Sequence, residues 1–233
     1  FVDTGDLHAL KDALKEPTRL LFLETPANPT LKLTDLEAAT ALGHAAGALV
    51  AVDNTFLTSA LQRPFETGAD VVVYSTTKYI EGHNATVGGA LITRDAALAE
   101  EIAFIKGTTG GTQAPFDAWL TLRGLKTLDV RVRQHSQNAL AVARFLESHP
   151  VIRRVWYPGL ESFPQHALAQ RQQRAGGGMI SFEVHGGTDA GIRLMNNLRV
   201  CSLAENLGAV ETLVTHPASM THACIPREVR EPL

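Results

Sequence analysis

The sequence predicts an α/β fold in which a mostly parallel β-sheet, with helices on both faces, is followed by a smaller α+β domain. Three short apolar runs, at 20–23, 49–52 and 71–74, lack the polar alternation of strands that have one face in water. Helical patterns separate these runs, as they do in βαβ units. Because the runs have no polar face, we expect strands that are buried on both sides.

The first strand and the helix after it have clear boundaries. A turn-rich segment, ETPANP at 24–29, follows the first apolar run at the carboxyl end of the strand. Thr34 then has the pattern of a helix N-cap, with Glu37 three residues later, which predicts a helix to about Ala46. Gly47 ends that helix, and the second strand follows almost directly.

The rest of the chain predicts more helix and then a mixed region. An apolar run at 87–92 precedes a helix at about 94–106, and a long helical pattern covers about 116–148. Short strands and helices are mixed after it. We therefore place a domain boundary near residue 130, with a large domain at 1–130 and a smaller, incomplete domain at 131–233.

Composition argues against several classes of function. The 233 residues are 45% hydrophobic and 19% charged with a net charge of −3, so no basic surface for nucleic acid or for a membrane is expected. The apolar runs are too short to span a bilayer. Two cysteines are too few for a disulfide framework, which indicates a reducing compartment, and we predict the cytoplasm. The nine scattered histidines and the lack of a CxxC pair predict no metal site.

Polar residues of three kinds follow the three strands. The first strand is followed by Asn28, the second by Asp53, and the third by Ser75, Thr77 and Lys78. Ligands of parallel sheets bind outside the carboxyl ends of the strands, so these side chains are expected at one site. A lysine can form a Schiff base with an aldehyde, a carboxylate can pair with a cationic nitrogen, and hydroxyls with backbone amides suit a phosphate. This set is what pyridoxal phosphate (PLP) requires of a protein.

Each of these residues also has an ordinary structural explanation. A lysine after a strand is commonly exposed to solvent, and an aspartate at a strand end commonly caps a helix. Serine and threonine hydroxyls in loops usually bond to the local backbone. Their combination at three consecutive strand ends favours a cofactor site, and the residues alone leave both interpretations open.

Longer motifs surround these residues. Lys78 lies in STTKYIEGHN (75–84), which is followed by small residues at 87–89, and VDNTF (52–56) surrounds Asp53. Five further blocks continue toward the end of the chain: PFD (115–117), LRGLKTL (122–128), VWYPGL (155–160), LAENLG (203–208) and HPASMTH (216–222). Together with ETPANP, they resemble the Cys/Met-metabolism family of PLP-dependent enzymes, which includes cystathionine γ-synthase and cystathionine γ-lyase. The resemblance covers essentially the whole chain.

The resemblance implies PLP fold type I, which is the fold of aspartate aminotransferase, with 1–130 forming the later part of the PLP-binding large domain. It implies that Lys78 holds PLP as a Schiff base and moves protons, and that Asp53 pairs with the pyridine nitrogen. Ser75 and Thr77 are expected to bind the phosphate. We expect burial or a nearby cation to lower the pKa of Lys78 from its usual value of ~10.4.

Further contacts are implied with the substrate. Asn28 is expected near the phenolic oxygen of the cofactor and the carboxylate of the substrate, and Thr55 is expected to touch the cofactor. Glu205 and Asn206 are expected to line the substrate pocket, although the family commonly has serine where this chain has Asn206. Arg131, on the long helix, is interpreted with Arg133 as part of a solvated face or an interface.

The implied function is γ-replacement or γ-elimination on an activated homoserine or on cystathionine. The close alternatives are an O-succinyl- or O-acetylhomoserine sulfhydrylase and a methionine γ-lyase. An alternative of another class is a catalytically incomplete remnant that serves only as a subunit or interaction module. The resemblance also implies a homotetramer of dimers with shared active sites. Family members extend beyond Phe1 and Leu233, so the chain is expected to be a fragment or a natural truncation.

Overall fold

The predicted strands and helices form in the expected order. The computed structural model describes residues 1–226 and 228. Its elements are α1 (Leu7–Ala13), β1 (Leu20–Glu24), α2 (Leu36–Ala45), β2 (Leu49–Asp53), α3 (Thr58–Leu61), the 3₁₀-helix η1 (Pro64–Glu66), β3 (Val71–Ser75), the π-helix η2 (Thr76–Ile80), β4 (Gly89–Thr93), α4 (Ala96–Thr109), α5 (Pro115–Leu125), α6 (Leu128–Ser148), β5 (Ile152–Trp156), α7 (His166–Gln172), β6 (Ser181–Val184), α8 (Gly187–Asn196), β7 (Ser202–Leu203), β8 (Leu213–Val214) and the 3₁₀-helix η3 (Pro217–Ser219).

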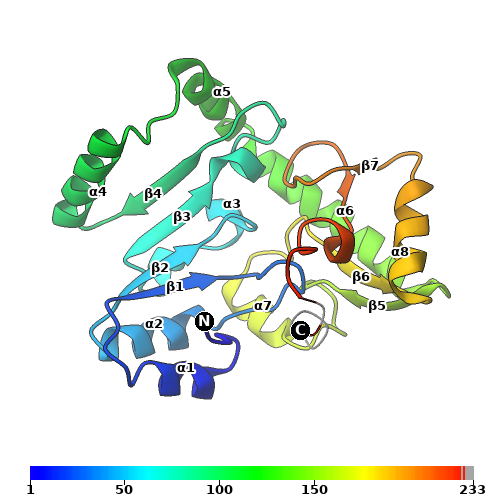
Figure 1. The fold of residues 1–233 in the computed structure, drawn as a ribbon, viewed down its shortest axis with the longest axis horizontal. Coiled ribbons are helices and arrows are strands. Elements are labelled where there is room, and N and C mark those ends of the chain that lie inside the picture. The colour runs from blue at the N-terminus through cyan, green and yellow to red at the C-terminus, as the bar shows by residue number, and fades with distance from the viewer. Residues whose placement is uncertain (227, 229–233) are drawn as a thin grey trace.

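The main sheet has four strands in the order β1-β2-β3-β4 (Figure 1). The first three strands run parallel, and β4 pairs antiparallel with β3. The mostly parallel sheet with flanking helices is thus confirmed. The register places Glu24 beside Asp53, and Asp53 beside Val73. The carboxyl ends of the three parallel strands therefore meet at one edge, as the sequence predicts.

Helices α1 and α2 cover one face of β1 and β2. The buried side chains of this core are Leu10, Leu21, Leu23, Leu36, Ala39, Val50, Val52 and Ala69. Burial of one such leucine or valine stabilises the fold by roughly 1.5–3 kcal/mol. Helix α2 begins one residue later than predicted, because the carboxylate of Asp35, not the hydroxyl of Thr34, accepts from a first-turn amide, that of Ala38.

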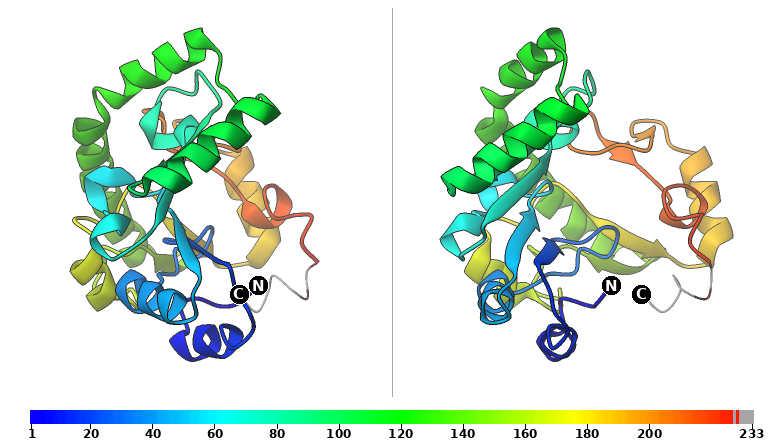
Figure 2. Two further views of the ribbon diagram at one scale, coloured as in Figure 1. Left: turned by 90° about the vertical axis from the view of Figure 1, so that its left-hand side faces the viewer. Right: turned by 60° about the vertical axis from the view of Figure 1, so that its left-hand side comes forward.

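Part of the other face of β1 and β2 is open to solvent. Leu20, Phe22 and Leu49 are 53%, 54% and 44% exposed. The continuous apolar runs predicted helices on both faces of these strands. In the part of the chain that the structure describes, helices α1 and α2 pack on one face of β1 and β2, and part of the other face stays exposed. Figure 2 shows α1 with α2 at one end of the molecule, and α4 with α5 at the other.

The long helical pattern at 116–148 is two helices rather than one. Helix α5 ends at Leu125, and α6 begins at Leu128. The chain turns between them, where the backbone amide and the hydroxyl of Thr127 both donate to Gly124 O, at 3.1 and 3.2 Å. The apolar periodicity continues through this turn, so periodicity alone did not predict the break.

The residues after α6 form smaller units. Strands β5 and β6 make an antiparallel pair that packs on α6 around Ala143, Val155 and Tyr157, and β7 pairs with β8. No larger second sheet exists among residues 1–226 and 228, so a complete smaller α+β domain is not present there. The boundary near residue 130 stays a prediction.

Helix α7 packs against the first part of the chain. The Gln165 side chain makes two hydrogen bonds of 2.7 Å with the backbone of Leu33. The Gln172 side chain accepts from Leu36 N at 3.2 Å and donates to Thr34 O at 3.1 Å. These contacts cross the predicted domain boundary and fix the segment between β1 and α2.

Candidate active site

Lys78 lies in an irregular turn directly after β3. The π-helical turn η2 is closed by a bond of 3.0 Å from Glu81 N to Thr76 O and a bond of 2.8 Å from Gly82 N to Lys78 O. Lys78 itself has φ −94° and ψ −126°, which is not helical. Irregular π-turns of this kind are frequent at functional sites.

The Lys78 side chain is half-buried and has one polar partner among the described residues. Burial lowers the pKa of its amine, as the sequence predicts, which increases the neutral fraction that can attack a carbonyl carbon. Lys78 Nζ donates to Asn206 Oδ1 at 2.5 Å. Asn206 Nδ2 donates to Asn84 Oδ1 at 2.6 Å, and Asn84 Nδ2 donates to Glu211 Oε2 at 3.2 Å. A chain of hydrogen bonds thus starts at the amine.

Asp53 ends β2 on the same edge of the sheet. Its Oδ1 accepts from Thr55 N at 2.9 Å, and Thr55 Oγ1 accepts from Ser75 N at 2.8 Å. These two hydrogen bonds join the ends of β2 and β3 through Thr55, which is buried. The second carboxylate oxygen of Asp53 has no hydrogen-bond partner within residues 1–226 and 228, so it is available to a ligand.

The two hydroxyls predicted to bind phosphate differ in their surroundings. The Ser75 hydroxyl has no hydrogen-bond partner in the described part of the chain. Thr77 Oγ1 donates to Gly88 O at 3.2 Å and accepts from Gly88 N at 3.0 Å. Ser75 is therefore free to donate to a phosphate, whereas Thr77 would first have to release the Gly88 carbonyl.

Asn28 and Glu205 are less closely connected to Lys78. Both are exposed. Asn28 N donates to Glu24 Oε1 at 3.2 Å, and Glu24 lies beside Asp53 in the register. Glu205 precedes Asn206, whose amide reaches the lysine. The structure thus brings Lys78 to Asn206 and Asp53 to Thr55 and Ser75, while the roles of all these residues stay predictions.

Two buried amides that the sequence did not suggest connect the strand ends. Gln62 Nε2 donates to Thr25 O at 3.1 Å and to Asn54 Oδ1 at 3.0 Å. Asn54 Nδ2 donates to Gln62 O at 2.9 Å and to Tyr74 Oη at 3.2 Å. Asn54 could have been suspected because it follows Asp53 in the motif. No sequence signal points to Gln62, because its partners Thr25 and Asn54 come from separate segments of the chain.

The available groups fit PLP. Lys78 offers an amine with a lowered pKa, Asp53 offers an unpaired carboxylate oxygen one strand away, and Ser75 offers a free hydroxyl at the same edge. They match the aldehyde, the pyridine nitrogen and the phosphate of that cofactor. Among the described residues, no group of three His, Cys, Asp or Glu side chains could hold a metal ion. None of the described helices is both long and apolar enough to cross a membrane.

Comparison with known proteins gives consistent results. The L-methionine gamma-lyase of Fusobacterium nucleatum subsp. polymorphum is 51% identical over 234 residues, which cover 99% of this chain and 59% of that protein. The cystathionine gamma-synthase of Mycobacterium tuberculosis is 51% identical over 222 residues, which cover 95% of this chain and 57% of that protein. The cystathionine gamma-lyase of Bacillus subtilis is 45% identical over 99% of this chain and 60% of that protein.

A solved structure agrees with these relatives. The crystal structure of cystathionine gamma synthase from Xanthomonas oryzae pv. oryzae, in complex with aminoacrylate and cysteine, matches with a TM-score of 0.95 and 49% identity. The match covers 98% of this chain and 59% of that one. The chain therefore spans about 59% of the length of such relatives. The family model described as "Cys/Met metabolism PLP-dependent enzyme" matches residues 1–233. The chain belongs to the Cys/Met metabolism family of PLP-dependent enzymes.

Proposed function

We propose that this chain carries the cofactor lysine of an enzyme that performs γ-elimination or γ-replacement on amino-acid substrates of sulfur metabolism. The observation that carries the proposal is the half-buried Lys78, whose pKa is lowered by burial, one strand from the unpaired oxygen of Asp53. Relatives named methionine gamma-lyase, cystathionine gamma-synthase and cystathionine gamma-lyase support γ-chemistry. Their similar identities do not favour one substrate, so activated homoserine, cystathionine and methionine are all candidates.

Each residue of the site has a defined task in this proposal. When bound, PLP supplies an electron sink for the charge that develops at the substrate's α-carbon. Asp53 holds a proton on the pyridine nitrogen, which strengthens that sink. The neutral Lys78 amine accepts the α-proton, and Asn206 Oδ1 holds the amine in place when it is free. The Ser75 hydroxyl fixes the phosphate.

Reduction with borohydride tests the proposal directly. The PLP-loaded whole protein should show the visible absorbance of an imine, and borohydride should fix PLP on the peptide that contains Lys78. Lys78→Ala should lose the absorbance and all turnover, whereas Lys126→Ala, at an exposed lysine outside the site, should keep both. Labelling of another lysine would refute the site. A wild-type protein that binds no PLP would instead favour the interaction-module alternative.

We also propose that the whole protein is a cytoplasmic homotetramer built from dimers with shared active sites. The phosphate of PLP carries about two negative charges, and its burial requires a counter-charge. The lysine motif at 75–84 contains no arginine. Exposed apolar side chains on α4 and α5 offer a surface for another copy: Phe104, Ile105, Phe116, Trp119 and Leu122. Sedimentation of the whole protein tests the assembly, and a fully active monomer would contradict it.

A further inference from the structure

The carbonyls that follow Lys78 are held by an arginine from another element. Arg131, in the first turn of α6, donates from Nη1 to Tyr79 O at 2.7 Å and from Nη2 to Ile80 O at 3.2 Å. Tyr79 and Ile80 are the last residues of η2, where the non-helical backbone of Lys78 interrupts the regular helical pattern. Carbonyls at the end of a helix lack partners within that helix and need donors from elsewhere. The guanidinium thus satisfies the backbone immediately after the cofactor lysine.

The same guanidinium holds the junction between α5 and α6. Arg131 Nη2 also donates to Gly124 O at 2.7 Å, and Nε donates to Thr127 Oγ1 at 2.9 Å. All three nitrogens are therefore bound to uncharged oxygens, and no carboxylate of the described residues lies within ion-pair distance. Burial lowers the pKa of Arg131 and the charge of Glu81 raises it. A planar fork with several donors suits this arrangement, and the single ammonium of lysine does not.

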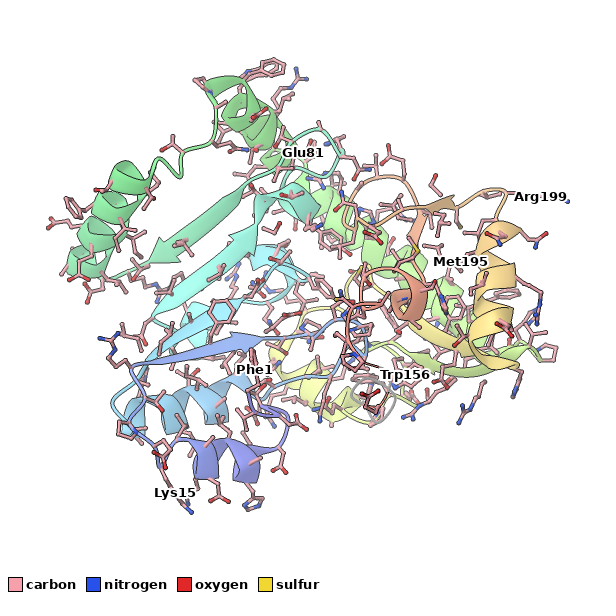
Figure 3. All side chains as sticks on the ribbon, in the orientation of Figure 1. Phe1, Lys15, Glu81, Trp156, Met195 and Arg199 are labelled. Atoms are coloured by element: carbon pink, nitrogen blue, oxygen red, sulfur yellow. The ribbon has the colours of Figure 1, made fainter. Side chains whose placement is uncertain are left out.

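Glu81 contributes the second part of this arrangement. Its side chain is 2% exposed, and its Oε2 accepts from His83 N at 3.0 Å and from Ala85 N at 3.1 Å. Figure 3 labels Glu81 near the junction of α5 and α6, beyond the end of β3. The carboxylate thus fixes the chain after the turn, while Arg131 fixes the turn itself.

Glycines allow these groups to come close. Gly82 has φ +77°, and a Cβ there would overlap Arg131 Nη1, while a Cβ at Gly124 would overlap Glu81 O. On the other side of the turn, Gly208 has φ +85°, and a Cβ there would lie 2.5 Å from Tyr79 N. The backbone around Lys78 is therefore enclosed from α5, from α6 and from the loop that carries Asn206.

We propose that Arg131 is a positioning residue for Lys78. It contacts neither the lysine side chain nor any predicted cofactor contact, and it acts through the carbonyls of the turn. By fixing the backbone on the carboxyl side of Lys78, it holds the amine where it can meet both Asn206 and the carbonyl carbon of PLP. This inference rests on the proposed function, because it assumes that Lys78 is the anchor of the cofactor.

The test compares Arg131→Gln and Arg131→Lys with Arg133→Gln in the whole protein. Arg133 is the matched control, because it lies on the same helix, is exposed, and forms an ion pair of 2.6 Å with Asp129. Two quantities are measured: the rate of imine formation after PLP is added to the apoprotein, and hydrogen exchange of the amides of Glu81 and Gly82 in the apoprotein. Loss of charge-assisted hydrogen bonds should slow imine formation and accelerate this exchange by about tenfold or more in Arg131→Gln.

The controls separate positioning from general stability. Arg131→Lys should recover only part of the effect, Arg133→Gln should match wild type, and amides of β1 and β2 should exchange at the wild-type rate in all variants. A small guanidinium compound should restore imine formation in Arg131→Gly, and methylammonium should not. Wild-type imine formation in Arg131→Gln would overturn the inference, as would equal acceleration of exchange across the whole protein. If wild-type protein forms no imine at all, the proposed function fails, and exchange at Glu81 and Gly82 alone shows whether Arg131 fixes the turn.

Discussion

At the scale of the residue, the Lys78 amine has the neutral side chain of Asn206 as its polar partner. The neutral Asn206 oxygen accepts from Lys78 Nζ at 2.5 Å, and burial lowers the pKa of that amine. A carboxylate in place of the amide would stabilise the charged form of the amine and raise its pKa. The pH at which half of the amine is neutral would then rise as well.

Asn206→Asp should therefore move the pH profile of imine formation to higher pH. The rate increases as Lys78 loses its proton, so a raised pKa requires more alkaline solution for the same rate. Asn138→Asp, on the exposed side of α6, serves as the control and should leave the profile unchanged. The measurement is the rate of imine formation in the apoprotein against pH. A shift toward acid would show that Asn206 does not set the titration of the amine.

Asp53→Asn should leave the fold intact and reduce turnover by orders of magnitude. The amide oxygen can still accept from Thr55 N, so the link from β2 to Ser75 survives. A neutral amide cannot hold the proton on a pyridine nitrogen, so the electron sink weakens. Circular dichroism tests whether the fold is intact, and measurement of kcat tests whether turnover falls. Near-normal kcat in a folded variant would remove Asp53 from its assigned role.

Sequence patterns pointed to residues next to strand ends and missed a residue whose partners lie far away in the chain. Asp53 ends β2 and Lys78 follows β3 closely, so local patterns could suggest both, and burial lowers the pKa of Lys78 as predicted, while their roles stay predictions. Arg131 was interpreted as part of a solvated face or an interface, and the first of these was wrong, because its guanidinium donates to Tyr79 O, Ile80 O and Gly124 O. Carbonyl partners as far as 52 residues away leave no periodic signal in the sequence.

At the scale of elements, a crowded glycine and an uncrowded glycine together test how closely the loop around Gly208 packs on the turn after Lys78. Gly208 has φ +85° and lies against Tyr79 N, so Gly208→Ala should lower the free energy of unfolding by about 1–3 kcal/mol and weaken PLP retention. Gly107 lies inside α4 with no atom within 4 Å of its expected Cβ, so Gly107→Ala should stabilise by about 0.5–1 kcal/mol. Denaturant melts measure both. Equal changes in the free energy of unfolding for the two variants would show that the close approach of Gly208 to Tyr79 N does not constrain residue 208.

The positions and the parallel direction of the first three strands were predictable, whereas the direction of β4 was not. The three parallel strands lie within one residue of the apolar runs that predicted them. Strand β4 runs antiparallel because only η2 and a loop, without a crossover helix, separate it from β3. The break between α5 and α6 escaped prediction because it depends on hydrogen bonds to Gly124 O, and helical periodicity does not register them.

At the scale of the whole molecule, this chain has exposed apolar surface and spans only part of the length of its relatives. Leu20, Phe22 and Leu49 face away from α1 and α2, and the chain spans about 59% of its relatives. The family resemblance implies further stacking and polar contacts to the cofactor outside these 233 residues, each worth about 1–3 kcal/mol, so we expect the chain alone to bind PLP weakly and to be a poor catalyst. Dialysis of the PLP-loaded chain, compared with the whole protein, measures this. Tight retention with full turnover would show that the chain is sufficient.

The docking of α7 has a consequence for the order in which the site forms during synthesis. Leu33 receives its partner Gln165 from 132 positions later in the chain, and Leu36 receives Gln172 from 136 positions later. We therefore expect the segment after β1, which leads from the ETPANP loop into α2, to gain these hydrogen bonds only after residues 165–172 have left the ribosome. Strands β1 to β3 can pair earlier, because their contacts are closer in sequence. We thus expect strands β1 to β3 to pair in the nascent chain before the loop that follows β1 is held by Gln165 and Gln172.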